Sequence, residues 1–189
     1  MSADSLPRRG STLLRRVLRW ALLPTIGICL LFYTWFYFFQ EVKLFEPNNL
    51  ARGYAPKREL NPSKDFFIEL VRARINVQKF DALIESPKGA VFFLHGNRGG
   101  IDQCRWAIEP FLRTGHDVWA MDYRGFGRST GPLSEAALLA DAQMVYKRIL
   151  EVQKETDIIV WGRSLGSGIA AFIAAGNSPK ALVLETPYW

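Results

Sequence analysis

Cysteine and histidine are both scarce in this chain of 189 residues, which contains two of each. Cys29 lies inside a long uncharged run, where no aqueous partner is within reach, so it is not expected to pair with Cys104. The sequence therefore predicts no disulfide, and its cysteine usage does not indicate a redox compartment. We also expect neither a metal ion nor a cofactor.

Beyond its first 19 residues, the chain also lacks a large excess of charge of one sign. The formal net charge of +6 comes mainly from five arginines in the first 19 residues, which only Asp4 opposes there. This distribution excludes the basic surface that is typical of nucleic-acid-binding proteins. The hydrophobic share of 49% and the aromatic share of 13% exclude disorder over the whole length. The length suits a single domain.

Charge is absent altogether from Trp20 to Phe39, a run of 20 residues. As a helix rising about 1.5 Å per residue, this run would cross a hydrocarbon core of roughly 30 Å. A cleaved signal peptide has a shorter apolar core and a small-residue cleavage site, and no such site follows here. A buried helix of a soluble protein is a third interpretation, although so many aromatic residues would be unusual for one. The sequence predicts a basic segment over residues 1–19 and a transmembrane anchor over residues 20–40.

The arginines before the anchor are denser and closer to it than the basic residues after it. This bias predicts a cytoplasmic N-terminus, with the rest of the chain on the outer (periplasmic or lumenal) side. Residues 41–63 are polar, contain three prolines and show no sustained period, so they are predicted to be a linker. A domain over residues 64–189 follows.

Strand and helix patterns alternate through this domain. Short apolar runs typical of strands are followed by segments with helical periodicity or helix-terminating residues. The predicted strands are 66–71, 80–85, 90–94, 118–121, 158–161 and 181–184. The predicted helices are 102–114, 135–152 with Ser134 as N-cap, and 167–176. Such alternation indicates the α/β class, with a doubly wound, mostly parallel sheet.

Ser164 occupies the centre of the sequence Gly162-Arg163-Ser164-Leu165-Gly166, directly after the predicted strand 158–161. A serine hydroxyl becomes a nucleophile when it is exposed on a sharp strand-to-helix turn, and flanking glycines Gly162 and Gly166 keep such a turn free of clashing side chains. The pattern alone is weak, because small residues are common where helices begin. The strand before it and the helix of small residues after it favour a catalytic nucleophile.

A second glycine-rich turn, beginning His95-Gly96-Asn97, follows the predicted strand 90–94. Backbone amides of Asn97 and Leu165 would together stabilise a developing oxyanion. The alternative is an ordinary glycine-rich loop without a catalytic role. A third segment, Asp122 to Ser129, is predicted to support the site structurally, with Asp122 and Arg124 bonding loop backbone.

The motifs HGN, DYRGFGRS, GRSLGSG and LETPY, in that order, resemble those of the α/β-hydrolase superfamily. More narrowly, the chain is similar to membrane-tethered α/β-hydrolase-domain proteins, which are serine esterases, lipases and thioesterases. The resemblance covers residues 66–189 and implies acyl-ester or thioester hydrolysis on a small-molecule or lipid substrate. It also implies that Ser164 is the nucleophile, with Leu165 and Asn97 as the oxyanion amides.

The sequence departs from the superfamily pattern, in which an acid and then a histidine follow the serine. No histidine follows Ser164. We expect His95 to brace its loop, and His116 to lie at the opposite end of the sheet, because it precedes the strand 118–121. Glu185 is a candidate acid, or else a carboxylate that braces a loop.

These departures predict a sheet of the α/β-hydrolase type that is incomplete at the C-terminus, with its last strand as an exposed edge. The expected function is that of the N-terminal two-thirds of a membrane-anchored serine hydrolase, truncated and inactive on its own. The alternative is a non-catalytic, membrane-tethered remnant or binding module with the same fold.

Overall fold

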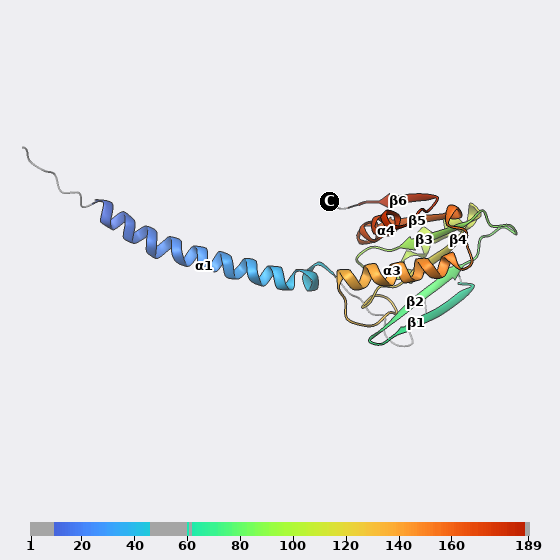
Figure 1. Cartoon of the computed structure of the whole chain (residues 1–189), viewed down its shortest axis with the longest axis horizontal. Coiled ribbons are helices and arrows are strands. Elements are labelled where there is room, and N and C mark those ends of the chain that lie inside the picture. The colour runs from blue at the N-terminus through green and yellow to red at the C-terminus, as the bar shows by residue number, and fades with distance from the viewer. Residues whose placement is uncertain (1–9, 46–59, 61, 188–189) are drawn as a thin grey trace, which may run out of the picture. The chain divides into compact units, whose positions relative to one another are not determined.

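A computed structural model of the chain describes residues 10–45, 60 and 62–187. The chain divides into two compact units, residues 1–44 and residues 45–189. In the first unit, α1 (Gly10–Leu44) is a single helix of 35 residues (Figure 1). It is therefore longer than the predicted anchor at both ends, and it includes the first four residues of the predicted linker. Most of the remaining linker lies outside the described residues.

The part of α1 from Arg16 to Gln40 is long and apolar enough to cross a membrane, with a mean hydropathy of 1.7 and no buried residue. Pro24 lies inside this stretch, where it removes one backbone donor from the helical ladder. The Thr25 hydroxyl donates a hydrogen bond of 2.8 Å to the Ala21 carbonyl in the same turn. The Thr25 hydroxyl thus has its hydrogen-bond partner within the helix, as a polar group in lipid requires.

The second unit is built on one sheet of six strands in the order β1-β2-β4-β3-β5-β6. β3, β4, β5 and β6 are parallel, whereas β2 is antiparallel to both β1 and β4. The strands are β1 (Lys64–Leu70), β2 (Ala73–Phe80), β3 (Ala90–Leu94), β4 (Asp117–Met121), β5 (Ile158–Arg163) and β6 (Ala181–Glu185). The sheet is mostly parallel, as the sequence predicted.

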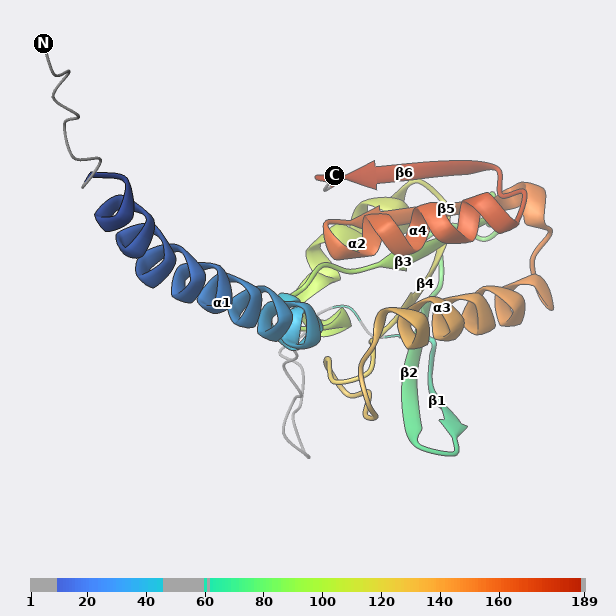
Figure 2. The ribbon, with the colours of Figure 1, turned by 60° about the vertical axis from the view of Figure 1, so that its left-hand side comes forward.

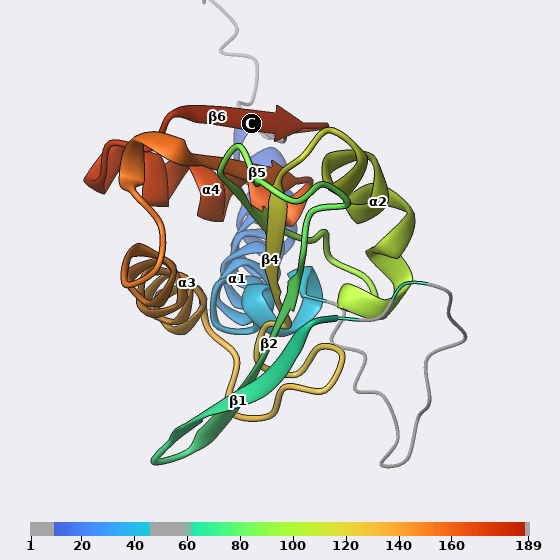
Figure 3. The ribbon, with the colours of Figure 1, turned by 90° about the vertical axis from the view of Figure 1, so that its right-hand side faces the viewer.

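Helices cover both faces of this sheet. Figure 3 shows α3 (Glu135–Leu150) and α4 (Leu165–Gly176) on one side, and α2 (Arg105–Arg113), which continues the 3-10 turn η1 (Ile101–Cys104), on the other. A second 3-10 turn, η2 (Glu155–Asp157), precedes β5. The Ser134 hydroxyl accepts a bond from the Ala137 amide and caps α3, as predicted. The doubly wound α/β architecture is confirmed.

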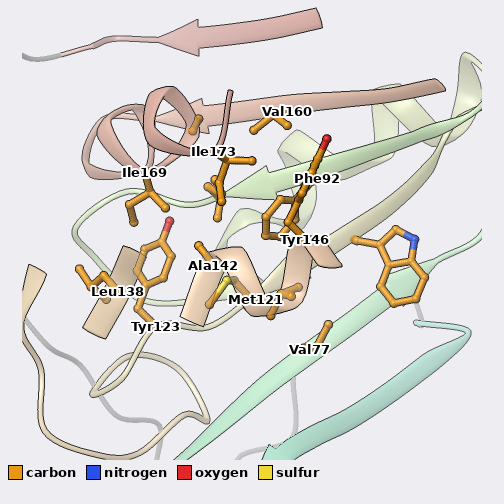
Figure 4. Close-up of a cluster of buried hydrophobic side chains, with 14 of the residues drawn as sticks. Val77, Phe92, Met121, Tyr123, Leu138, Ala142, Tyr146, Val160, Ile169 and Ile173 are labelled. Carbon is orange, nitrogen blue, oxygen red and sulfur yellow. The ribbon is translucent and has the colours of Figure 1, made fainter. Parts of the chain in front are cut away.

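Alternate residues of the central strands supply two separate cores, one on each face. Phe92, Met121 and Val160 pack with α3 and α4 in the larger core (Figure 4). Their immediate neighbours in sequence, Phe93, Ala120 and Trp161, belong to the smaller core, which packs against α2. β3 and β4 are buried along their whole length, which explains why all their residues except Asp117 are apolar.

The prediction of a strand over residues 80–85 is wrong. The second strand is β2, which ends at Phe80, and residues 81–85 have no regular structure. Val71, which we expected inside the first strand, is fully exposed at the turn between β1 and β2. The missed signal is the alternation of Ala73, Ile75 and Val77 with polar residues, which is the period of a strand.

β6 lies at the outer edge of the sheet (Figure 2) and is exposed on both faces. Leu182, Val183 and Leu184 are each about 40% exposed. This agrees with the predicted exposed edge. Open apolar edges of this kind pair readily with other strands.

Candidate active site

Ser164 has a backbone conformation that side chains seldom adopt, with φ 49° and ψ −117°. A left-handed φ at a residue other than glycine costs energy and is found where the surrounding structure holds it in place. Here the Ser164 amide donates to the Glu185 carbonyl at 2.9 Å, and the Ser167 amide and hydroxyl both donate to the Ser164 carbonyl. The turn between β5 and α4 is therefore a sharp, constrained one with the serine at its apex.

Only glycine fits at positions 162 and 166, two residues before and two residues after Ser164. A β-carbon on Gly162 would lie 2.1 Å from the Gly166 carbonyl oxygen and 2.6 Å from the Ala170 β-carbon. A β-carbon on Gly166 would lie 2.1 Å from the Leu94 carbonyl oxygen, at the end of β3. The absence of side chains thus lets α4 begin directly against both strands.

The loop after β3 lies beside the serine. A β-carbon on Gly96 would be only 3.5 Å from the Ser164 β-carbon. Gly96, Asn97 and Ser164 line one cavity of about 400 Å³, together with Arg98, Cys104, Arg163 and Thr186. Leu165, the other predicted oxyanion residue, is the first residue of α4. The structure therefore brings the two predicted motifs together at the carboxyl ends of β3 and β5.

His95 lies in this loop, but its ring is completely buried. The imidazole stacks on Tyr123 with 4.1 Å between ring centroids, and its Nδ1 is 2.7 Å from the Gly96 carbonyl. The Tyr123 hydroxyl donates to the His95 carbonyl at 2.8 Å. Burial lowers the pKa of His95 to about 4, although the Gly96 carbonyl opposes this shift. His95 is therefore neutral near pH 7 and packed as a brace for the loop.

The depressed pKa of His95 predicts a loss of stability in acid. Below its ordinary value of 6.5, the unfolded chain binds a proton that the folded chain excludes, so stability falls as pH falls toward 4. His95→Phe keeps a ring and removes this titration. Between about pH 7.5 and about pH 5, the wild type should lose about 2 kcal/mol more stability than the variant. Denaturant unfolding at both pH values measures the difference, and equal losses would contradict the prediction.

Asp122 is buried at the end of β4 and holds two loops. Its carboxylate accepts hydrogen bonds from the backbone amides of Ile101, at 2.8 Å, and Arg128, at 2.9 Å. These are the contacts to loop backbone that the sequence predicted for Asp122. Burial raises the pKa of Asp122 to about 7, against the effect of these two bonds. Arg124 does not bond loop backbone as expected, because its guanidinium forms an ion pair with Asp141 of α3.

His116 lies at the other end of the sheet from Ser164, as its position before β4 predicted. Its ring nitrogen Nδ1 is 3.2 Å from the Thr114 hydroxyl. Partial burial lowers the pKa of His116, and the charges of Lys180 and Lys88, which precede β6 and β3, lower it further. These neighbours stand at the amino ends of the strands, whereas Ser164 stands at a carboxyl end.

Glu185 ends β6 and lies opposite Arg163 in the register of the sheet. Its carboxylate is 3.2 Å from the Arg163 Nε, so its charged partner is an arginine rather than a histidine. Sequence reasoning missed four residues that line the cavity, namely Arg98, Cys104, Arg163 and Thr186. Arg163 and Thr186 carried a signal, since they lie inside the serine motif and the LETPY motif. In the described part of the chain, no cluster of three or more potential ligands could hold a metal ion.

A profile of the serine aminopeptidase family S33 matches residues 85–189, which is more than half of the chain. The lysophosphatidylserine lipase ABHD12 of Danio rerio is 32% identical over 116 residues, which cover 58% of this chain and 30% of the lipase. Protein bem46 of Schizosaccharomyces pombe is 26% identical over 193 residues, which cover 94% of this chain and 63% of bem46. The chain thus spans less than two thirds of each relative.

Solved structures show the same fold at low identity. An esterase of Pyrococcus furiosus superposes with a TM-score of 0.59 at 21% identity, over 76% of this chain and 57% of the esterase. A soluble variant of the monoglyceride lipase of Saccharomyces cerevisiae gives a TM-score of 0.55 at 20% identity, over 71% of this chain and 47% of the lipase. With the family profile and the geometry of the turn at Ser164, these likenesses show that the chain belongs to the S33 family of the α/β-hydrolase superfamily.

Proposed function

We propose that this chain carries the nucleophile and oxyanion site of a serine hydrolase that cleaves acyl esters or thioesters. The observation that carries the proposal is the strained backbone of Ser164 at the tip of a β5–α4 turn that opens into a cavity. The Ser164 hydroxyl would attack the acyl carbon and lose its proton to a base. The alcohol or thiol would leave with a proton, and water would then hydrolyse the acyl-enzyme.

The oxyanion of the tetrahedral intermediate would be stabilised by the backbone amides of Leu165 and Asn97. Asn97 lines the cavity with Ser164, and Leu165 directly follows it at the first turn of α4. Metal-free acyl transfer of this kind needs no cofactor. The lipase and esterase names of the relatives support a lipid or small-molecule acyl substrate.

Neither histidine, both of which lie in the described part of the chain, is placed to act as the general base. His95 is packed on Tyr123 in the core, and His116 lies at the opposite end of the sheet. Glu185, which we keep as a candidate acid, has Arg163 as its charged partner. We infer that the chain by itself is a very poor hydrolase. The lack of a base also favours the second candidate function, a membrane-tethered binding module that is not catalytic.

Labelling with a fluorophosphonate probe distinguishes the two functions. With imidazole added as an external base, the probe should form an adduct on Ser164 of the wild-type chain, and Ser164→Ala should abolish the adduct, because the probe reacts with an activated serine. Ser178→Ala is the matched control, since Ser178 is an exposed serine just beyond the other end of α4. Peptide mapping by mass spectrometry locates the adduct. A wild type that stays unlabelled in the presence of imidazole, or an adduct that survives Ser164→Ala, would count against the nucleophile.

We further propose that residues 20–40 anchor the chain in a membrane, with the N-terminus cytoplasmic and the α/β domain on the outer side. The apolar stretch of α1 supports the anchor, and the arginines before it support the orientation. Carbonate extraction of membranes should leave the chain in the pellet. Protease added to intact cells or spheroplasts should digest the domain. Extraction into the supernatant, or a mature N-terminus beyond Gln40, would contradict anchoring.

A further inference from the structure

Arg163 precedes Ser164 and lines the same cavity. Its guanidinium carbon lies 4.7 Å from the centre of the Trp106 ring, and its Nε lies 3.2 Å from Glu185. The side chain is 34% exposed. The guanidinium is therefore held between α2 and β6 at the rim of the cavity, while remaining accessible to a ligand.

Arg163 differs from an arginine with a purely structural role in the same domain. Arg124 is only 17% exposed and donates from both Nε and Nη2 to the carboxylate of Asp141, at 2.7 and 2.8 Å. Among the described residues, Arg163 has one charged partner, and that carboxylate faces Nε. A guanidinium presents five N–H donors in a planar fork. Its terminal nitrogens thus retain donors for a ligand in the cavity.

The lining of the cavity favours an anion. Arg98 and Arg163 contribute its charged side chains, and Asn97, Ser164 and Thr186 contribute polar groups. Among the described residues, no acidic residue is part of this lining, although Glu185 borders it from β6 as the partner of Arg163. A volume of about 400 Å³ is within the range of small-molecule sites. Arginine in such a place suits bidentate binding of phosphate or carboxylate.

We propose that Arg163 is a specificity-determining residue, which binds a negatively charged group in the leaving part of the acyl substrate. The proposal rests on the proposed function, because it places the anion one residue from the serine that would attack the ester. The shared chemistry is a phosphate or a carboxylate. A neutral acyl ester would lack this interaction and would bind more weakly.

Binding of ligands without a scissile bond tests this proposal on the full chain in micelles of a neutral detergent. Dodecyl phosphate, dodecanoate and dodecanol share one alkyl chain and differ in the charge and type of the head group. Tryptophan fluorescence reports binding, since Trp106 lies against Arg163. Arg163→Gln should weaken binding of the preferred anion by about tenfold or more, as for a lost charge-assisted hydrogen bond. Dodecanol binding should not change.

Arg148→Gln is the matched control, because Arg148 also forms an exposed pair with a glutamate, Glu151, but lies on α3. Arg148→Gln should leave the affinities for all three ligands unchanged. This result would exclude nonspecific binding of anions to the positively charged chain. Glu185→Gln should tighten anion binding, because it removes the carboxylate that competes for Arg163. A preference for dodecyl phosphate would identify a phosphate-bearing substrate, and a preference for dodecanoate a carboxylate-bearing one.

The proposal would be overturned if Arg163→Gln bound both anions as tightly as the wild type does. It would also be overturned if the variant's affinity for dodecanol fell by the same factor as its affinity for the anions. The first result would place the anion elsewhere, and the second would reveal a damaged cavity. None of these ligands can be cleaved, so the outcome does not depend on Ser164 acting as a nucleophile. Failure of the proposed function would appear instead in the fluorophosphonate experiment.

Discussion

Gly166→Ala is expected to destabilise the α/β domain by about 3 kcal/mol or more, because the added methyl group meets backbone rather than a flexible side chain. The new β-carbon would lie 2.1 Å from the Leu94 carbonyl oxygen and 2.7 Å from that of His95. These atoms belong to the end of β3 and the loop after it, which are buried. Relief of the clash therefore requires α4 to move away from the sheet, and Ser164 would move with it.

Gly176→Ala is the control for this substitution. Gly176 ends the same helix, and a β-carbon there would meet no atom within 4 Å. Replacing a helical glycine without strain typically stabilises a protein by about 0.4–1 kcal/mol, because the unfolded chain loses freedom. Denaturant unfolding of both variants, followed by circular dichroism, measures the contrast. If Gly166→Ala were as stable as Gly176→Ala, the close contact between α4 and β3 would be wrong.

The parts of the fold that could be predicted are those in which a local pattern determines the structure. β3 and β4 are buried on both faces, so their sequences are short and, apart from Asp117, apolar. In α3, apolar residues at intervals of three and four face the sheet, and Ser134 marks where the helix begins. β2 was misplaced although Ile75 and Val77 alternate in sequence with the polar residues Asn76 and Gln78, which are buried on the other face of the strand.

The site could be predicted only as far as the sequence motifs extend. Ser164 and Gly96 meet because parallel strands β3 and β5 are neighbours and their carboxyl ends share one edge of the sheet. The pairing of Arg163 with Glu185 depends on the register of β5 and β6, which no local pattern encodes. The contact of Arg163 with Trp106 depends on the position of α2 on the sheet. Long-range contacts of this kind required the structure.

Hydrolysis of a p-nitrophenyl ester by residues 1–189 is expected to be very slow and to increase when imidazole is added. Neither His95 nor His116 is placed to accept the Ser164 proton. The oxyanion amides alone would give about 10³ to 10⁴-fold acceleration over water, as in enzymes stripped of their catalytic residues. A positioned base contributes about 10² to 10⁴-fold. Imidazole that enters the open cavity beside Ser164 should restore part of the acceleration that a positioned base provides. We expect a rate increase of about tenfold or more.

The serine-dependent part of this increase is the quantity that matters, since imidazole itself attacks activated esters. Subtracting the rate of Ser164→Ala at each imidazole concentration isolates it, and Ser178→Ala should match the wild type. The isolated rate should rise with pH as imidazole loses its proton, because only the neutral ring accepts one. A fast Ser164-dependent rate without imidazole would mean that a base exists within the chain. Equal rates for the wild type and Ser164→Ala would favour the non-catalytic binding module, because a formed oxyanion site with a reactive serine must respond to a base.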